Sequence, residues 1–290
     1  MADSESISDL IALLDLEEIE QNHYRGRGPN EGWQRVYGGQ VLGQALVAAS
    51  RTVPEDRQAH SLHGYFLRAG DTDAPILYTV DRIRDGRSFT TRRVVAIQHG
   101  QAIFSMSISF QVEEAGLTHQ LPMPKVPNPE ELPDEAELRK QWVDQLPDVD
   151  VESLLRQRPL EVRPINPQDV MNPEPRPPHA MCWMKARESL PDDLRLHQCV
   201  LAYLSDWSLL DTATLPHGVS FMQSNMQMAS LDHALWFHRP FRADEWLLYV
   251  QDSPSTSGAR GLNRGMMFNQ NGDLVASAAQ EGLVRMLPES

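Results

Sequence analysis

The segment LVASAAQEGLVRML, residues 274–287, decides the fold of this chain. Alternate residues in it are apolar or small, which predicts a β-strand with one face in a core. That phase contains Leu274, Ala276, Ala278, Gln280, Gly282, Val284 and Met286. Gln280 is its polar member, and burying an amide without hydrogen-bond partners costs about 1–3 kcal/mol. Gln280 is therefore a satisfied core glutamine, part of a strand end that reaches water, or a member of a polar site.

A second strand of the same kind occurs earlier in the chain. When Gly100 is aligned with Gly272, alternate residues of the earlier strand match the apolar face of residues 274–286. These residues are Ala102, Phe104, Met106, Ile108 and Phe110. In this alignment Ile108 is the counterpart of Gln280. Because one copy keeps an apolar residue where the other carries an amide, the asymmetry favours a specialised site in the second copy.

Other short strings recur in the same order and at nearly constant spacing. The pairs are residues 61–62 with 230–231, 76–78 with 247–249, and 98–100 with 270–272. Ordered matches of this kind indicate an internal duplication.

Each copy begins with a helical pattern and continues with several strands. The helices are expected at residues 40–50 and 196–210. The strands are expected at 59–67, 76–84, 88–99 and 101–112, and again at 223–238, 245–252, 259–270 and 272–286. A helix followed by consecutive strands predicts the α+β class, with an antiparallel sheet packed on a helix.

A proline-rich stretch separates the two copies. Thirteen of the 21 prolines lie between Pro122 and Pro178, in a segment that is also acidic. This composition predicts a connection that crosses the surface, with a short helix near residues 134–146. We therefore expect a first repeat at residues 1–112, a connection at 113–179, and a second repeat at 180–290 that carries the site.

Composition narrows the possible partners and locations. The net charge of −14 argues against a nucleic-acid partner, which requires a basic surface. No apolar run is long enough to span a membrane, and the acidic N-terminus does not resemble a secretory signal, so a cytoplasmic protein is expected. Cys182 and Cys199 are too few for a disulfide framework or a zinc site and are expected to be buried thiols.

Two further polar residues lie close to predicted buried faces. Asp206 falls on the flank of the apolar stripe of the helix at 196–210, where a partly exposed aspartate is the simplest interpretation. Ser230 is in phase with Met226 and Met228, and serine is common on strand faces. Together with Gln280, these residues offer a carboxylate, a hydroxyl and an amide. Such a set can orient a water molecule, and the carboxylate can take its proton as the water attacks a carbonyl.

Arginines cluster in equivalent strands of both copies. Arg82, Arg84, Arg87, Arg92 and Arg93 lie close together in the first copy, and Arg260 and Arg264 in the second. They form either a phosphate-binding patch, since guanidinium groups suit phosphates, or a solvated strand face.

The sequence gives no strong indication of a metal or cofactor site. It contains no G-x-S-x-G elbow, no P-loop and no dinucleotide-binding glycine pattern. Four histidines, His60, His63, His233 and His238, lie near strands, where hydrogen bonding is a commoner role than metal ligation. We therefore expect neither a metal nor a cofactor.

Several strings resemble the acyl-CoA thioesterase II family over essentially the whole chain. They are YGGQVLGQA at 37–45, HSLHGYFLR at 60–68, RDGRSF at 84–89, YLSD at 203–206, LDHALWFHRP at 231–240 and AQEG at 279–282. The resemblance implies a double-hotdog fold, in which each of two repeats wraps an antiparallel sheet around a long helix. It also implies a homo-oligomer, namely a tetramer.

The same resemblance implies hydrolysis of medium- to long-chain fatty acyl-CoA to free CoA and a fatty acid. The family's catalytic aspartate, hydroxyl residue and glutamine match Asp206, Ser230 and Gln280. Arg87, Arg92, Arg93, Arg260 and Arg264 would then meet the CoA phosphates.

Two alternative functions are an enoyl-CoA hydratase and a non-catalytic acyl-CoA-binding protein. An enoyl-CoA hydratase on the same fold would need a paired aspartate and histidine, and residues 196–210 contain no Asp-x-x-x-x-His string. A non-catalytic acyl-CoA-binding protein would not need the complete set of Asp206, Ser230 and Gln280.

Overall fold

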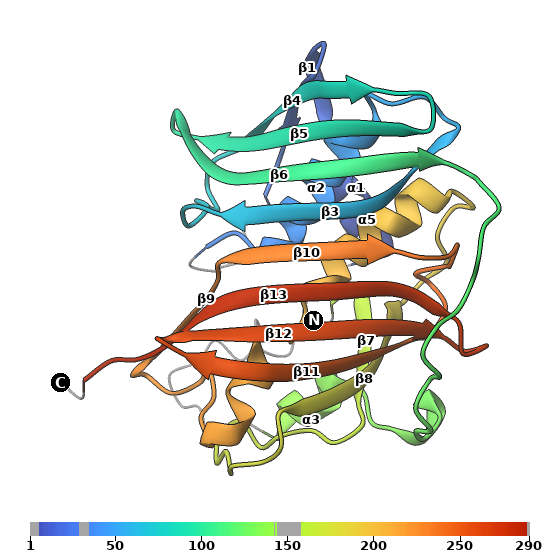
Figure 1. Ribbon diagram of the computed structural model, residues 1–290. Coiled ribbons are helices and arrows are strands. Elements are labelled where there is room, and N and C mark those ends of the chain that lie inside the picture. The colour runs from blue at the N-terminus through green and yellow to red at the C-terminus, as the bar shows by residue number, and fades with distance from the viewer. Residues whose placement is uncertain (1–5, 29–34, 142, 144–157, 289–290) are drawn as a thin grey trace.

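The computed structural model describes residues 6–28, 35–141, 143 and 158–288. In these ranges a 13-stranded sheet runs through both repeats (Figure 1). The first repeat contributes, in spatial order, β1 (Glu17–Glu20), β2 (His23–Gly26), β4 (Ile76–Asp85), β5 (Phe89–Gln98), β6 (Gln101–Val112) and β3 (Arg57–Phe66). The second continues with β10 (Asp232–Phe237), β13 (Leu274–Met286), β12 (Arg260–Asn269), β11 (Leu247–Ser257), β8 (His179–Ala186) and β7 (Leu160–Pro164).

The order of strands is the same on either side of the central β3–β10 pair. Moving outward from this centre, β6 corresponds to β13, β5 to β12 and β4 to β11. All neighbouring strands are antiparallel, including β3 and β10 where the repeats join. The predicted duplication and the α+β double-hotdog fold are therefore confirmed.

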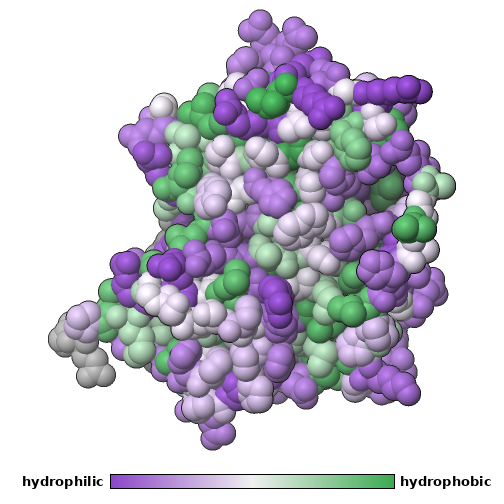
Figure 2. Space-filling view, viewed as in Figure 1, coloured by the Kyte–Doolittle hydropathy of each residue, from purple (hydrophilic) through white to green (hydrophobic). Residues whose placement is uncertain are grey.

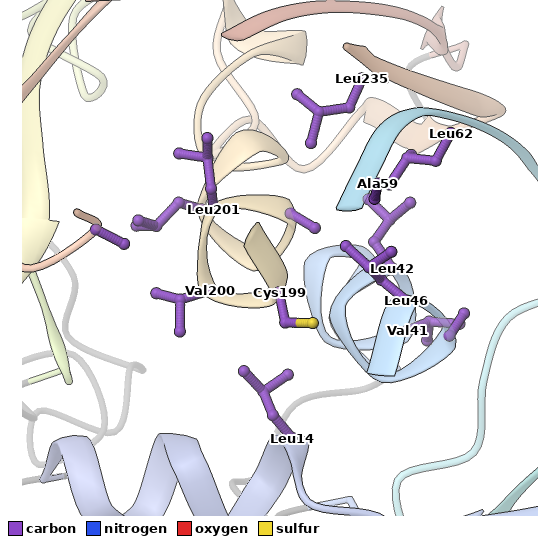
Figure 3. Packing of buried hydrophobic residues seen from close by; sticks show 14 of the residues in the cluster. Leu14, Val41, Leu42, Leu46, Ala59, Leu62, Cys199, Val200, Leu201 and Leu235 are labelled. Carbon is purple, nitrogen blue, oxygen red and sulfur yellow. The ribbon is translucent and has the colours of Figure 1, made fainter. Parts of the chain in front are cut away.

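Three helices lie on one side of the sheet: α1 (Ile7–Leu14), α2 (Gly38–Ser50) and α5 (Leu194–Ser205). Figure 3 shows α2 and α5 next to each other, with Leu14 of α1 on one side of them. From the sheet, Leu62 of β3 and Leu235 of β10 point toward the helices, and both are completely buried. The core thus lies between the sheet and the helix pair and includes residues of both repeats.

Two glycines allow α2 and α5 to approach backbone to backbone. A Cβ atom on Gly39 would lie 2.3 Å from the carbonyl oxygen of Tyr203, and one on Gly43 would lie 3.1 Å from that of Cys199. The two glycines are four residues apart and therefore share one helix face. Side chains larger than hydrogen would force the two repeats apart at this contact.

The helix α5 ends earlier than predicted. It stops at Ser205 rather than continuing to residue 210, and Asp206 is its C-cap. Two residues later Ser208 has a left-handed φ of 58°, which turns the chain away from the helix axis. The expected position of Asp206 on a helix flank is therefore wrong, because Asp206 lies at the helix end.

The strand predicted at residues 223–238 is also interrupted. It forms two strands, β9 (Met226–Ser230) and β10, with Leu231 between them. β9 pairs with β13, whereas β10 pairs with both β13 and β3. The backbone of Leu231 bridges the break, donating to Glu281 O and accepting from Phe66 N.

The proline-rich connection covers the outer face of the second repeat. Apolar side chains of the connection pack against a small outer cluster of buried residues, Trp183, Trp246, Leu248 and Phe268. The predicted short helix is present as α3 (Glu135–Lys140), while residues 142 and 144–146 lie outside the described ranges. The connection also contains β7, a strand of the sheet that the composition did not predict.

The two cysteines and one face of the sheet complete the description of the fold. Cys182 and Cys199 are buried free thiols, as predicted, and burial raises the pKa of each to about 12. The sheet face turned to the viewer in Figure 2 mixes hydrophilic and hydrophobic side chains. Among the helices in the described ranges, none is long and apolar enough to cross a bilayer.

Candidate active site

The three predicted residues Asp206, Ser230 and Gln280 come together between α5 and the sheet. The amide nitrogen of Gln280 donates to Asp206 Oδ1 at 2.5 Å and to Ser230 Oγ at 3.0 Å. Ser230 Oγ lies 3.4 Å from Asp206 Oδ1, to which it donates. Gln280 is 1% exposed and the side chain of Asp206 is 6% exposed, so neither a wet strand end nor an exposed helix flank describes them.

Asp206 is held in place through the residue that precedes it. Tyr249 of β11 donates its hydroxyl to Ser205 O at 2.8 Å, and His233 of β10 bonds Ser205 Oγ at 2.9 Å. These two contacts anchor the end of α5 to two separate strands. The carboxylate of Asp206 therefore projects from a fixed point rather than from a freely moving loop.

His233, identified from the sequence only as one of four histidines near strands, is a neighbour of the site. Its Nδ1 lies 3.9 Å from Asp206 Oδ1, and its side chain is fully buried. Ser205 Oγ donates to Ala202 O, so His233 Nε2 is the donor to Ser205 and Nδ1 is left as an acceptor. Burial lowers the pKa of His233, and the nearby Asp206 carboxylate acts in the opposite direction.

Two of the other three histidines form the hydrogen bonds predicted from the sequence. His60 bonds Ser109 Oγ at 2.8 Å and His238 bonds Ser277 Oγ at 2.9 Å. His63 packs edge-on against the Trp236 ring.

Three buried acceptors around Gln280 have no partner in the described part of the chain. They are Gln280 Oε1, Asn263 Oδ1 and His233 Nδ1. Asn263 lies directly opposite Gln280 in the β12–β13 register. Buried acceptors are normally satisfied by protein donors or by ordered water, so this part of the site is suited to hold a water molecule.

The equivalent row of the first repeat is built differently. There Ile108 replaces Gln280, with Leu62 and Arg92 as its registered neighbours on β3 and β5. Leu62 and Ile108 leave no acceptor unpaired, since they have none. The row of unpaired side-chain acceptors around Gln280 thus has no counterpart around Ile108 in the first repeat.

The first repeat nevertheless contributes its helix terminus to the site. A Cβ atom on Gly38, the first residue of α2, would lie 2.6 Å from Asp206 Oδ2. The first N–H groups of a helix have no intrahelical acceptor and carry partial positive charge. Asp206 therefore has the amide of Gln280 beside one oxygen and the N-terminus of α2 beside the other.

A further carboxyl group lies near the site. Asp211, in the short 3₁₀ helix Leu210–Ala213, has its pKa raised to about 7, first by burial and then by the charges of Glu135 and Asp206. Burial, followed by Asp206, also raises the pKa of Tyr37, whose hydroxyl donates to Tyr203 O. The surroundings of Asp206 are therefore poorly hydrated and negatively charged.

The predicted arginine patch is not brought together with the three polar residues. Arg93 pairs with Asp81 at 3.0 Å, Arg260 with Glu281 at 2.9 Å and Arg264 with Asp252 at 2.7 Å. Arg87 is exposed. Since Glu281 adjoins Gln280 along β13, strand alternation puts Arg260 and its partner on the opposite face of the sheet from Asp206.

Assigning Arg92 to a phosphate-binding surface is wrong. Its side chain is 1% exposed, and its guanidinium donates to Thr52 Oγ1, Thr52 O, Arg84 O, Thr91 O and Asp85 Oδ1. These contacts occupy all of its nitrogens. Arg92 joins the end of α2 to β4 and is a structural residue of the core.

We expect Arg92→Met to lower the free energy of unfolding by about 2–3 kcal/mol, because Thr52 and Arg84 would keep buried acceptors without donors. Arg93→Met, one residue along the strand, removes only an exposed ion pair and should cost less than about 1 kcal/mol. Urea unfolding of the two variants measures the difference. Equal losses in both variants would contradict the structural role of Arg92.

Comparison with known proteins agrees with this fold and identifies the family. Residues 152–283 match the family model described as acyl-CoA thioesterase, and residues 28–111 match the model for the acyl-CoA thioesterase N-terminal domain. Acyl-CoA thioesterase 2 of Haemophilus influenzae is 42% identical over 97% of this chain and 99% of its own length. Mouse acyl-coenzyme A thioesterase 8 is 43% identical, over 96% of this chain and 89% of the relative.

A solved structure shows the same fold. The acyl-CoA thioesterase II TesB2 of Mycobacterium marinum superimposes with a TM-score of 0.77 at 46% identity, covering 95% of this chain and 97% of the other. The superposition of nearly full length includes both copies of the duplication. The chain belongs to the acyl-CoA thioesterase family.

Proposed function

We propose that this protein hydrolyses medium- to long-chain fatty acyl-CoA to free CoA and a fatty acid, using water activated by Asp206, Ser230 and Gln280. The observation that carries this proposal is the buried amide of Gln280. Its nitrogen is committed to Asp206 and Ser230, which leaves Oε1 as an unpaired acceptor beside the carboxylate.

In the proposed reaction a single water molecule donates two hydrogen bonds, one to Asp206 and one to Gln280 Oε1. Its oxygen attacks the thioester carbonyl carbon while Asp206 accepts one proton, forming a tetrahedral intermediate with a negatively charged oxygen. When that intermediate collapses the carbon–sulfur bond breaks, and the proton on Asp206 passes to the CoA sulfur. The carboxylic acid and the thiol leave, and Asp206 is again ionised.

The N-terminus of α2 is suited to stabilise the charged oxygen. Gly38 lies next to Asp206 Oδ2, and the amides of Gly38 and Gly39 precede Gln40, whose N–H is the first to reach an acceptor at Tyr37 O. Preorganised N–H donors aimed at a developing oxyanion commonly supply a large part of the rate enhancement. Glycine at residue 38 also leaves room for the carbonyl group to approach the carboxylate.

Gln280→Ile replaces the amide by the residue that the first repeat uses at the equivalent place. We expect kcat to fall about 10²-fold or more, since water loses one of its two acceptors and Asp206 loses a donor. Release of CoA thiol from palmitoyl-CoA, followed with a thiol-reactive dye, measures this. Wild-type kcat in a variant whose melting temperature is unchanged would contradict the role of Gln280.

The same assay tests the proposed function against its alternatives. A thioesterase releases one thiol for each acyl-CoA consumed. A non-catalytic acyl-CoA-binding protein releases none, and an enoyl-CoA hydratase consumes an enoyl-CoA without releasing thiol. Cytoplasmic location, expected from the lack of a signal or membrane segment, and assembly as a tetramer, implied by the family resemblance, stay predictions.

A further inference from the structure

An apolar strip leads away from the candidate active site along β9 and β13. It consists of Met226, Met228, Val284 and Met286 and is called the methionine strip here. In the β9–β13 register Ser230 pairs with Gly282, Met228 with Val284 and Met226 with Met286. Residues two apart along a strand, and residues directly opposed across a pair, share one face of the sheet.

That face is the one on which the catalytic set lies. Ser230 is an even number of residues from Met226 and Met228 on β9, and Gln280 is likewise spaced from Val284 and Met286 on β13. Ser230 and Gln280 bond each other and Asp206 on the helix side of the sheet. The strip therefore begins at the residues that would activate the water beside the thioester carbonyl. Leu210 adds an apolar wall at this point, since a Cβ atom on Gly282 would lie 2.3 Å from Leu210 Cδ1.

On β13, exposure rises along the strip with distance from the site. Val284 is 9% exposed, Met226 and Met228 are half-buried, and Met286 is 59% exposed. Apolar side chains of a core are buried along their whole length, whereas an apolar surface that binds a ligand is accessible to it. Methionine side chains are flexible and adapt to irregular apolar partners.

The length and chemistry of the strip fit one occupant. From Ser230 to Met226 a strand rises about 13 Å, which is comparable with an extended acyl group of medium length. None of the four side chains carries a charge or a hydrogen-bonding N–H or O–H group. We propose that the methionine strip binds the acyl chain of the thioester and determines chain-length preference, an inference that rests on the proposed hydrolysis of acyl-CoA.

The test compares two substrates that differ only in chain length, butyryl-CoA and palmitoyl-CoA. Met228→Glu places a carboxylate in the middle of the strip, and Ala229→Glu places the same carboxylate one residue along, on the opposite face. We expect Met228→Glu to lower kcat/KM for palmitoyl-CoA about tenfold or more, mainly through KM, because buried methylenes lose their apolar contact. Its kcat/KM for butyryl-CoA should stay within about threefold, and Ala229→Glu should change neither value by more than that.

Met226→Glu provides a second variant nearer the exposed end, where a charge is easily tolerated by the fold. It should also reduce activity on palmitoyl-CoA and spare butyryl-CoA. An unchanged ratio of the two kcat/KM values in both strip variants, or the same change of ratio in Ala229→Glu, would overturn the inference. Failure of the wild-type protein to release thiol from either substrate would instead refute the proposed function.

Discussion

Asp206→Asn is expected to lower kcat by about 10²–10⁴-fold while leaving the fold intact. Asparagine has nearly the same shape as aspartate and can still accept a hydrogen bond from Gln280. It cannot take a proton from water, so the attack on the thioester loses its general base. Thiol release at saturating palmitoyl-CoA measures kcat, and thermal unfolding checks that the variant is folded.

Asp252→Asn is the matched control. Asp252 is also an aspartate of the second repeat, but it pairs with Arg264 on β12. Its replacement should change kcat by less than about twofold, because exposed ion pairs contribute little. Near wild-type activity in Asp206→Asn would contradict the proposed base.

Isotope labelling distinguishes water attack from direct attack by the carboxylate. In a single turnover in ¹⁸O-water, direct water attack puts the label into the fatty acid and leaves Asp206 unlabelled. An anhydride intermediate on Asp206, opened by water at the aspartyl carbon, would leave label in the aspartate side chain. Label on Asp206 would therefore replace the proposed mechanism with a covalent one.

Gly39→Ala is expected to lower the free energy of unfolding by about 3 kcal/mol or more. The new methyl group would lie 2.3 Å from Tyr203 O and 2.5 Å from the Tyr37 ring. A backbone carbonyl cannot rotate aside as a long side chain can, so α2 and α5 would have to separate. Because Gly38 adjoins Asp206, that movement should lower activity as well.

Gly116→Ala separates this effect from the general cost of replacing glycine. A Cβ atom on Gly116 would meet nothing within 4 Å, so its replacement should change stability by less than about 0.5 kcal/mol. Urea unfolding measures both variants. A loss below about 1 kcal/mol in Gly39→Ala would show that the helices can adjust without breaking their contact.

The architecture of the sheet could be predicted from the sequence because strand alternation and the repeat are local signals. The end of α5 could not, since Trp207 and Leu210 continue the apolar stripe of the helix. The turn depends on the left-handed backbone at Ser208, which hydropathy does not encode. The break at Leu231 was missed for a similar reason, because both halves of that strand alternate normally.

The residues of the site also differ in how clearly the hydropathy pattern indicated them. Gln280 was evident as a polar residue on an apolar strand face. Asp206 and Ser230 became site candidates mainly through the family resemblance. His233 and Asn263 carried the same signal as Gln280, because each occupies the inward phase of its own strand. Grouping polar residues by the strand face they occupy, rather than by their proximity in sequence, would have associated both with Gln280.

The same rule explains the error at Arg92. Arg92 and Arg93 are adjacent in sequence, but alternation points them to opposite faces of β5. The contact between Gly38 and Asp206 was beyond prediction, since it joins the start of one repeat's helix to the end of the other's. Only the packing angle of the two helices determines it.

The different residues at Ile108 and Gln280 have a genetic consequence. In an assembly of two identical single-repeat chains, every substitution appears twice, so a change that improves packing at one interface also alters the other. Joining both copies in one gene removes that constraint. Selection could then keep an isoleucine for cohesion in one copy and a glutamine for chemistry in the other, with each residue free to evolve separately.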